Sequence, residues 1–67
     1  MQITLNNNTE IFDRDFLTVP ELLQKKNFTF KMLIVKINGI LIKKTDFETT
    51  RIKDGDQVEV LHLISGG

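Results

Sequence analysis

Apolar and polar side chains alternate over the first residues of the chain. Ile3 and Leu5 point to one side of an extended strand, while Gln2 and Thr4 point to the other. This period of two is typical of a strand with one buried face. The letters "NNNTE" then predict a turn, because asparagine tolerates the left-handed backbone and bonds its own main chain. We therefore expect a hairpin with a second short strand over residues 10–13.

A helix start follows in the letters "FLTVPELLQKK". Thr18 and Glu21 have the spacing of a capping box, in which each side chain accepts a hydrogen bond from the other residue's main-chain N–H. Leu17 before the cap and Leu22 in the helix have the spacing of a hydrophobic staple. The pattern predicts a helix over about residues 19–26.

Two apolar runs in "MLIVKINGILIKK" are separated by Asn38 and Gly39. This dipeptide readily takes the positive φ angles of a tight turn that matches strand twist. The segment therefore predicts a second hairpin. Alternation places Leu33, Val35 and Ile37 on the face that meets the core.

The remaining segment predicts a short helical turn, a second turn and a strand. Thr45 and Glu48 repeat the capping-box spacing, which predicts one helical turn that directs Phe47 inward. The letters "KDGD" are typical of a turn. The letters "QVEVLHLI" then predict a final strand with Val58 and Val60 on one face.

The order of these elements predicts an α+β fold. Burying the apolar faces of the strands and of the helix needs a mixed sheet of about four or five strands with one main helix across it. That arrangement is the β-grasp, or ubiquitin-like, fold. The first and last strands are expected to be parallel neighbours, because the long connection through the helix permits it.

The composition is that of one small folded domain, residues 1–67. Apolar residues make up 40% of the chain and charged residues 27%, as in ordinary soluble proteins. A chain of this size buries only about 60% of its unfolded surface, which leaves little room for an enclosed active site. The chain has no cysteine, so any sulfur chemistry needs sulfur from another molecule. Without a signal-peptide pattern or an apolar run of membrane-spanning length, the expected location is cytoplasmic, with no membrane partner.

Charge is distributed unevenly along a chain whose formal net charge is +0. The segment 25–44 has six lysines and no acidic residue, namely Lys25, Lys26, Lys31, Lys36, Lys43 and Lys44. These lysines can be interpreted as a basic face for nucleic acid, but the segment has no arginine and the chain has no excess positive charge. We favour a solvated surface that faces a protein partner, with no nucleic acid bound.

The sequence contains no pattern typical of a metal site or of catalytic side chains. His62 is the only histidine and has no cysteine or second histidine to complete a metal site. We interpret it as a structural residue near the edge of the core. Asp54 and Asp56 flank Gly55, but no glutamate follows at the spacing of a calcium loop. Turn chemistry explains this pair better.

The chain ends on "LHLISGG". Glycine brings no side chain to a core and loses the most backbone freedom on ordering, so we expect a flexible Gly-Gly tail from about residue 64. Leu61 and Leu63 lie on the strand face opposite Val58 and Val60. Exposed there, they would form a docking patch beside the tail. The alternative is that another segment of the chain covers them.

The motifs "TVPELL", "VKINGILI" and "DGDQVEVLHLISGG", in this order and in a chain of this length, resemble the ThiS family of sulfur carriers of thiamin biosynthesis. The resemblance spans nearly the whole chain. It implies that a ThiF-like enzyme uses ATP to adenylate the carboxylate of Gly67. Sulfur from a persulfide donor protein then gives a thiocarboxylate, which supplies a ThiG-like thiazole synthase.

The same resemblance implies roles for the residues before the terminus. Ser65 and Gly66 would thread into the partner, and Leu61, Leu63 and Ile64 would dock on it. The chain would be a protein co-substrate rather than an enzyme, with no cofactor bound to it and ATP used by its partner.

Three other functions remain open. The small subunit of molybdopterin synthase is a sulfur carrier of the same fold, although its typical chain is longer. A ubiquitin-like protein modifier would use the same terminal adenylate to form isopeptide bonds. A ubiquitin-like binding module would carry its glycines only as a disordered end and would not react with an activating enzyme.

Overall fold

The computed structural model describes residues 1–28 and 32–62. In chain order these residues form β1 (Gln2–Leu5), β2 (Asn8–Ile11), β3 (Phe16–Thr18), α1 (Val19–Lys25), β4 (Leu33–Ile37), β5 (Ile40–Ile42), the 3₁₀ turn η1 (Lys44–Asp46), β6 (Arg51–Lys53) and β7 (Gln57–His62). The expected tail from about residue 64 lies outside the described residues.

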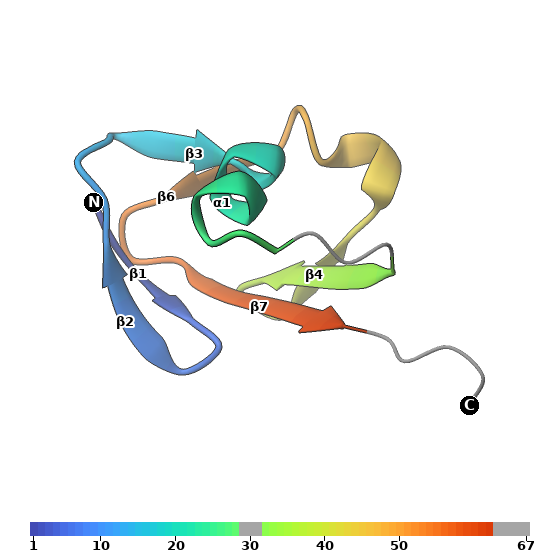
Figure 1. Cartoon of the computed structure of the whole chain (residues 1–67), viewed down its shortest axis with the longest axis horizontal. Helices are drawn as coiled ribbons and strands as arrows, with labels where there is room; N and C mark the ends of the chain where they lie inside the picture. Colours follow the sequence, from blue (N-terminus) through green and yellow to red (C-terminus); the bar gives the residue numbers. More distant parts are fainter. Residues whose placement is uncertain (29–31, 63–67) are drawn as a thin grey trace.

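The main sheet has five strands in the order β2-β1-β7-β4-β5. β7 runs parallel to β1, with Leu5 opposite Val58, and antiparallel to β4, with Val35 opposite Val60. Helix α1 and the two-stranded β3–β6 sheet lie over the same face of this main sheet (Figure 1). The predicted α+β, β-grasp architecture is confirmed, including the parallel pairing of the first and last long strands.

The core lies between the main sheet and the layer formed by α1, β3 and β6. Its side chains are all aliphatic, and each is at most 8% exposed: Ile3, Leu5, Leu17, Val19, Leu22, Val35, Ile37, Ile52, Val58 and Val60. Leu17 and Leu22, the two residues of the expected staple, are both fully buried here. Apolar burial therefore joins segments from both ends of the chain.

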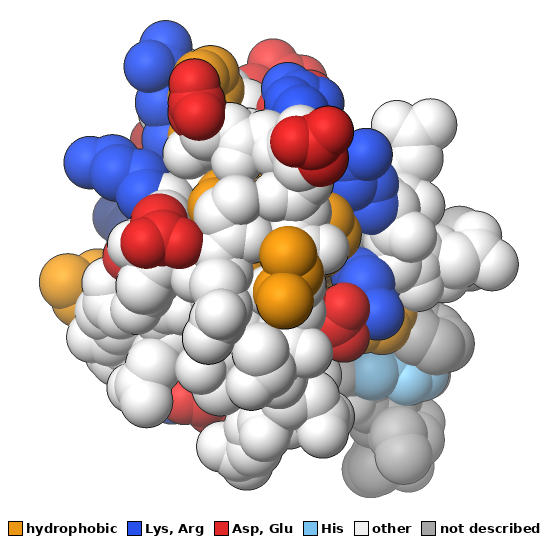
Figure 2. All heavy atoms as spheres, turned by 90° about the vertical axis from the view of Figure 1, so that its left-hand side faces the viewer, with side chains coloured by type: hydrophobic (Ala, Val, Ile, Leu, Met, Phe, Trp, Pro, Cys, Tyr) orange, Lys and Arg blue, Asp and Glu red, His pale blue; other side chains and the backbone are white. Residues whose placement is uncertain are grey.

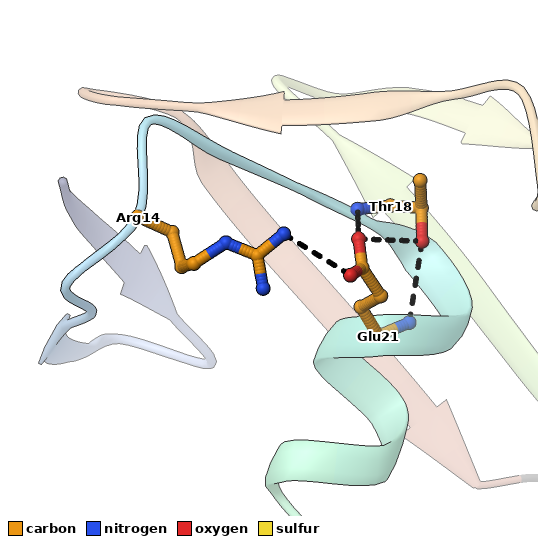
Figure 3. A network of polar contacts seen from close by, with 3 residues as sticks. All are labelled: Arg14, Thr18 and Glu21. Atoms are coloured by element: carbon orange, nitrogen blue, oxygen red, sulfur yellow. Dashed lines mark hydrogen bonds and ion pairs between the residues drawn. The ribbon is translucent and has the colours of Figure 1, made fainter.

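Helix α1 begins with the predicted capping box (Figure 3). The N–H of Glu21 donates to Thr18 Oγ1 at 3.4 Å, and the N–H of Thr18 donates to Glu21 Oε1 at 2.9 Å. Arg14 adds a bond to Glu21 Oε2 at 3.2 Å. Bonding to the Thr18 N–H first, then to the Thr18 hydroxyl and to Arg14, lowers the pKa of Glu21 below its ordinary value, although partial desolvation opposes this. Helix α1 ends at Lys25, one residue earlier than predicted.

The first hairpin is tighter than the sequence predicted. Only Asn6 and Asn7 form its turn, with φ angles of 50° and 69°. Pairing resumes at once, with Asn8 opposite Leu5. The prediction of a second strand over residues 10–13 was therefore wrong in its bounds. A two-residue turn with positive φ angles follows the twist of the strands, so no longer loop is needed.

The β3–β6 sheet was not predicted. Each of its strands has three residues, and Leu17 pairs with Ile52 at its centre. Both of these side chains are fully buried. Three residues are too few to show a period of two, so the pairing depends on burial against the rest of the core.

The capping box predicted at Thr45 and Glu48 was wrong. The 3₁₀ turn begins after Lys43, and no side chain bonds to its first N–H groups. The hydroxyls of Thr49 and Thr50 instead donate to the carbonyl of Asp46, at 3.2 and 2.7 Å. A turn of three residues leaves too little helix for reciprocal capping. Its neighbour Phe47 is partly buried against the core, as predicted.

The two faces of β7 predict opposite responses to the same substitution. Val58 is 1% exposed, so Val58→Asp buries a charge without a partner, and we expect the domain to unfold. Leu61 is 43% exposed, so Leu61→Asp should cost about 1 kcal/mol or less. Urea melts measure both effects, with Leu61→Ser as the uncharged control. An equal loss of stability for the two aspartate variants would contradict the assignment of faces.

Candidate functional site

β7 is the last strand described and leads to the chemically distinctive end of the chain. It lies between β1 and β4 in the main sheet. Its side chains alternate, with Val58 and Val60 buried and Glu59 and Leu61 exposed, which confirms the predicted faces. The other residues expected to act, Leu63, Ile64, Ser65, Gly66 and Gly67, lie outside the described residues.

An apolar patch surrounds Leu61 on the outer face of the sheet, the face away from α1. Ile34 lies directly opposite Leu61 on β4 and is partly buried. Leu41, 58% exposed on β5, lies opposite Lys36, which in turn lies opposite Glu59. Residues that face each other across strands or along a diagonal share one surface. We call Ile34, Leu41 and Leu61 the outer patch.

Only part of the outer patch was identified from the sequence. Leu61 was proposed for docking, whereas Ile34 and Leu41 were not. Neither Ile34 nor Leu41 was connected with Leu61, because that connection depends on β4 lying between β5 and β7. The pairing register supplies this information, and no local sequence pattern contains it.

Two lysines of the segment 25–44 lie beside acidic residues from other segments, and one of them forms an ion pair. Lys26 Nζ lies 2.9 Å from Glu10 Oε2, and Lys36 lies opposite Glu59 in the sheet. Acidic and basic side chains are mixed on the face shown in Figure 2. Lys31 lies outside the described residues. Acidic and basic residues from separate segments of the sequence therefore lie beside each other in the fold, as expected for a solvated surface.

His62 and the aspartates of the last turn were the other residues singled out. His62 is exposed at the end of β7, and the histidine is visible at the surface in Figure 2. His62 was expected near the edge of the core, and its exposed side chain lies outside the buried core to which Val60 belongs. Asp54 Oδ1 accepts from the N–H of Gln2 at 2.6 Å, and Asp56 Oδ2 accepts from the N–H of Lys53 at 2.8 Å. Asp54 lies in the turn, as predicted, but its bond ties the turn to β1, whereas the Asp56 bond is local to the turn and confirms the predicted turn chemistry for that residue.

Within residues 1–28 and 32–62, no group of three His, Asp or Glu side chains is placed to hold a metal ion. None of the helices in the described part of the chain has the length and apolar character needed to cross a membrane.

Two asparagine side chains bond to the main chain of β7. Asn6 Oδ1 accepts from the N–H of Val60 at 2.9 Å, and Asn6 Nδ2 donates to the carbonyl of Val60 at 3.1 Å. Asn38 Oδ1 accepts from the N–H of Gln57 at 2.9 Å, and the N–H of Asn38 donates to the carbonyl of Gln57 at 2.7 Å. The sequence indicated only the turns in which both asparagines lie. Their bonds to β7 were missed.

Comparison with known proteins gives consistent results. The crystal structure of a thiamine biosynthesis protein, ThiS, from Geobacter metallireducens matches with a TM-score of 0.90 and 33% identity, over 100% of both chains. A solution structure of a thiamine biosynthesis protein from the same organism matches with a TM-score of 0.80 and 32% identity, over 100% of this chain and 88% of that chain. The uncharacterized protein ycf40 of Trieres chinensis is 23% identical over 61 residues, which are 91% of this chain and 84% of that protein.

The family comparison agrees with the motifs and with the fold. The model of the ThiS family matches residues 2–67, so the match includes the outer strand face, the last strand and the terminal glycines. On this match and the structural similarity to a ThiS protein, the chain belongs to the ThiS family.

Proposed function

We propose that this protein is a sulfur carrier of thiamin biosynthesis and that the carboxylate of Gly67 carries the sulfur. The observation that carries the proposal is the family match, which continues through residue 67. The matched range thus includes the Gly-Gly end. The similarity to the ThiS structure over 100% of both chains supports the same function.

The terminal carboxylate has the chemistry for activation by a partner. An α-carboxylate has a pKa of about 3.5, so it is ionised at neutral pH and can act as a nucleophile. On a ThiF-like enzyme, the Gly67 carboxylate attacks the α-phosphorus of ATP and pyrophosphate leaves. The resulting acyl adenylate has AMP as a good leaving group, which the free carboxylate lacks.

Sulfur transfer follows from attack at the activated carbonyl. The terminal sulfur of a persulfide on a donor protein attacks the Gly67 carbon, and AMP leaves. A second thiol then attacks the donor's sulfur in the acyl disulfide. This step releases the thiocarboxylate and leaves a disulfide on the donor side. A ThiG-like thiazole synthase receives the sulfur. Because thiols are kept reduced in the cytoplasm, we place these reactions there.

The tail and the outer patch make different contributions to binding the activating enzyme. Gly66 has no Cβ, so it suits a narrow channel together with Ser65. Ordering such a tail costs about 1–2 kcal/mol of backbone entropy per residue, which contacts elsewhere must offset. We propose that Leu61, together with Leu63 and Ile64, docks on the activating enzyme.

The first test separates a sulfur carrier from a protein modifier. We expect the protein purified from its native host to include a form heavier by the difference between one sulfur and one oxygen, located at Gly67. Intact-mass spectrometry measures this, and the same protein made without sulfur-transfer partners is the control. Conjugates to lysines of other proteins, without the sulfur form, would favour a modifier. The molybdopterin synthase alternative predicts the same mass gain but sulfur delivery to a different acceptor enzyme.

The second test removes Gly67. No buried side chain is lost, so the urea midpoint should hardly change. The new carboxylate is about 3.3–3.6 Å short of its position in the partner, one extended residue. A displacement near 1 Å can already cost about a hundredfold in rate. Pyrophosphate exchange with the activating enzyme should therefore collapse. Exchange at the wild-type rate would exclude Gly67 as the reactive residue.

The third test concerns docking. Leu61→Asp places a charge in the outer patch and should weaken binding to the activating enzyme by about tenfold or more, because a buried charge at an interface needs a partner. Titration calorimetry on the folded variant measures the affinity. Thr9→Asp on β2, an exposed position distant in strand order from the patch, is the control. Equal affinities for the two variants would show that the outer patch does not dock.

A further inference from the structure

We propose that Asn6 is a positioning residue for the reaction at the chain terminus, and this inference rests on the proposed function. Its carboxamide holds Val60 where β7 extends beyond its neighbour β1. In this role Asn6 steadies the end of β7, the strand from which the chain continues toward Gly67. Asn6 does not touch the reacting atoms.

β7 loses one of its two neighbouring strands before it ends. On the β1 side, the paired residues are Thr4 with Gln57 and Leu5 with Val58, and β1 ends there. On the β4 side, pairing continues to His62. The last residues of β7 therefore have a strand on one side and the turn after β1 on the other.

The side chain of Asn6 takes the place of the missing strand at one residue of β7. The N–H of Asn6 still donates to the carbonyl of Val58 at 2.9 Å, as a continuing strand would. Its carboxamide then bonds to both main-chain groups of Val60, at 2.9 and 3.1 Å. Val60 is 7% exposed, so these bonds lie beside the core and are partly shielded from water.

The chemistry of this contact is specific to asparagine. One carboxamide offers an acceptor and a donor, whereas aspartate at neutral pH offers only acceptors. The φ of Asn6 is 50°, in the left-handed region that asparagine adopts more readily than most other residues. Asn6 therefore meets two requirements at once, namely the turn and the pairing with β7.

The contact matters for the terminus because, without it, the end of β7 from Val60 to His62 would be held by β4 alone. Val60 is the last residue of β7 for which Asn6 supplies hydrogen bonds on the β1 side. Strand ends with partners on one side open more easily than strand interiors. Loss of the contact would therefore let the end of β7 move in the complex with the activating enzyme, and small displacements of reacting groups strongly reduce rates.

The test uses Asn6→Gly, which retains access to a positive φ and removes the carboxamide. Asn7→Gly is the matched control, because Asn7 lies in the same turn with a φ of 69° and its side chain makes no hydrogen bond to the described part of β7. Asn6→Asp keeps the acceptor and loses the donor. All variants are compared at a temperature at which urea melts show them folded.

Two readouts follow. Hydrogen exchange by NMR should show the Val60 amide exchanging about tenfold faster in Asn6→Gly than in Asn7→Gly, because its acceptor is gone. In pyrophosphate exchange with the activating enzyme, Asn6→Gly should lower kcat by about tenfold with KM changed less than about twofold, because docking is intact and positioning is lost. Asn6→Asp should fall between Asn6→Gly and wild type.

Each other outcome overturns the inference in a distinguishable way. If Asn6→Gly lowers the urea midpoint but keeps wild-type kcat and KM, Asn6 only stabilises the fold. If KM rises with kcat unchanged, Asn6 contributes to docking instead. If the wild-type protein shows no pyrophosphate exchange at all, the proposed function fails and the positioning role fails with it.

Discussion

The pairing of β7 between β1 and β4 is the interaction on which the rest of the molecule depends. It joins the first strand of the chain to the last one described, across the helix and both hairpins. On one face β7 supplies Val58 and Val60 to the core, and on the other it supplies Leu61 to the outer patch. In a domain this small, stability and the proposed docking therefore depend on the same six-residue strand.

Local signals predicted much of this fold. Thr18 and Glu21 form a capping box whose two bonds involve residues three apart, so the sequence contains all the information needed. The Asn38-Gly39 turn is similar, with both residues at positive φ. The pairing of Leu17 with Ile52 is different in kind. It joins two very short strands far apart in sequence, and only burial against the rest of the core selects it.

The candidate site was predicted less completely, for a related reason. Period-two alternation was enough to predict that Leu61 is exposed. The order of the strands is what brings Ile34 and Leu41 into the same outer patch as Leu61. Asn6 was correctly assigned to a turn. Its side-chain bonds to β7 were missed, because the turn alone already explains an asparagine at this position. The terminal glycines carry no packing signal. Only their place in the family pattern indicates chemistry.

The asparagine contacts also fix which residues of β7 face inward. Asn38 bonds to Gln57 at one end of the strand, and Asn6 bonds to Val60 further along. A slip of β7 by one residue would turn every side chain to the opposite face, with Leu61 entering the core and Val60 leaving it. The exchange of Val60 for Leu61 would keep an apolar side chain inside, but Glu59 would enter the core together with Leu61, and the cost of burying its charge opposes the slip. The carboxamides add to this discrimination, because each bonds to main-chain groups of one residue of β7, Val60 or Gln57, and a slipped strand would lose both sets of bonds. The asparagines of the two turns thus help to set the register of β7 relative to its neighbouring strands.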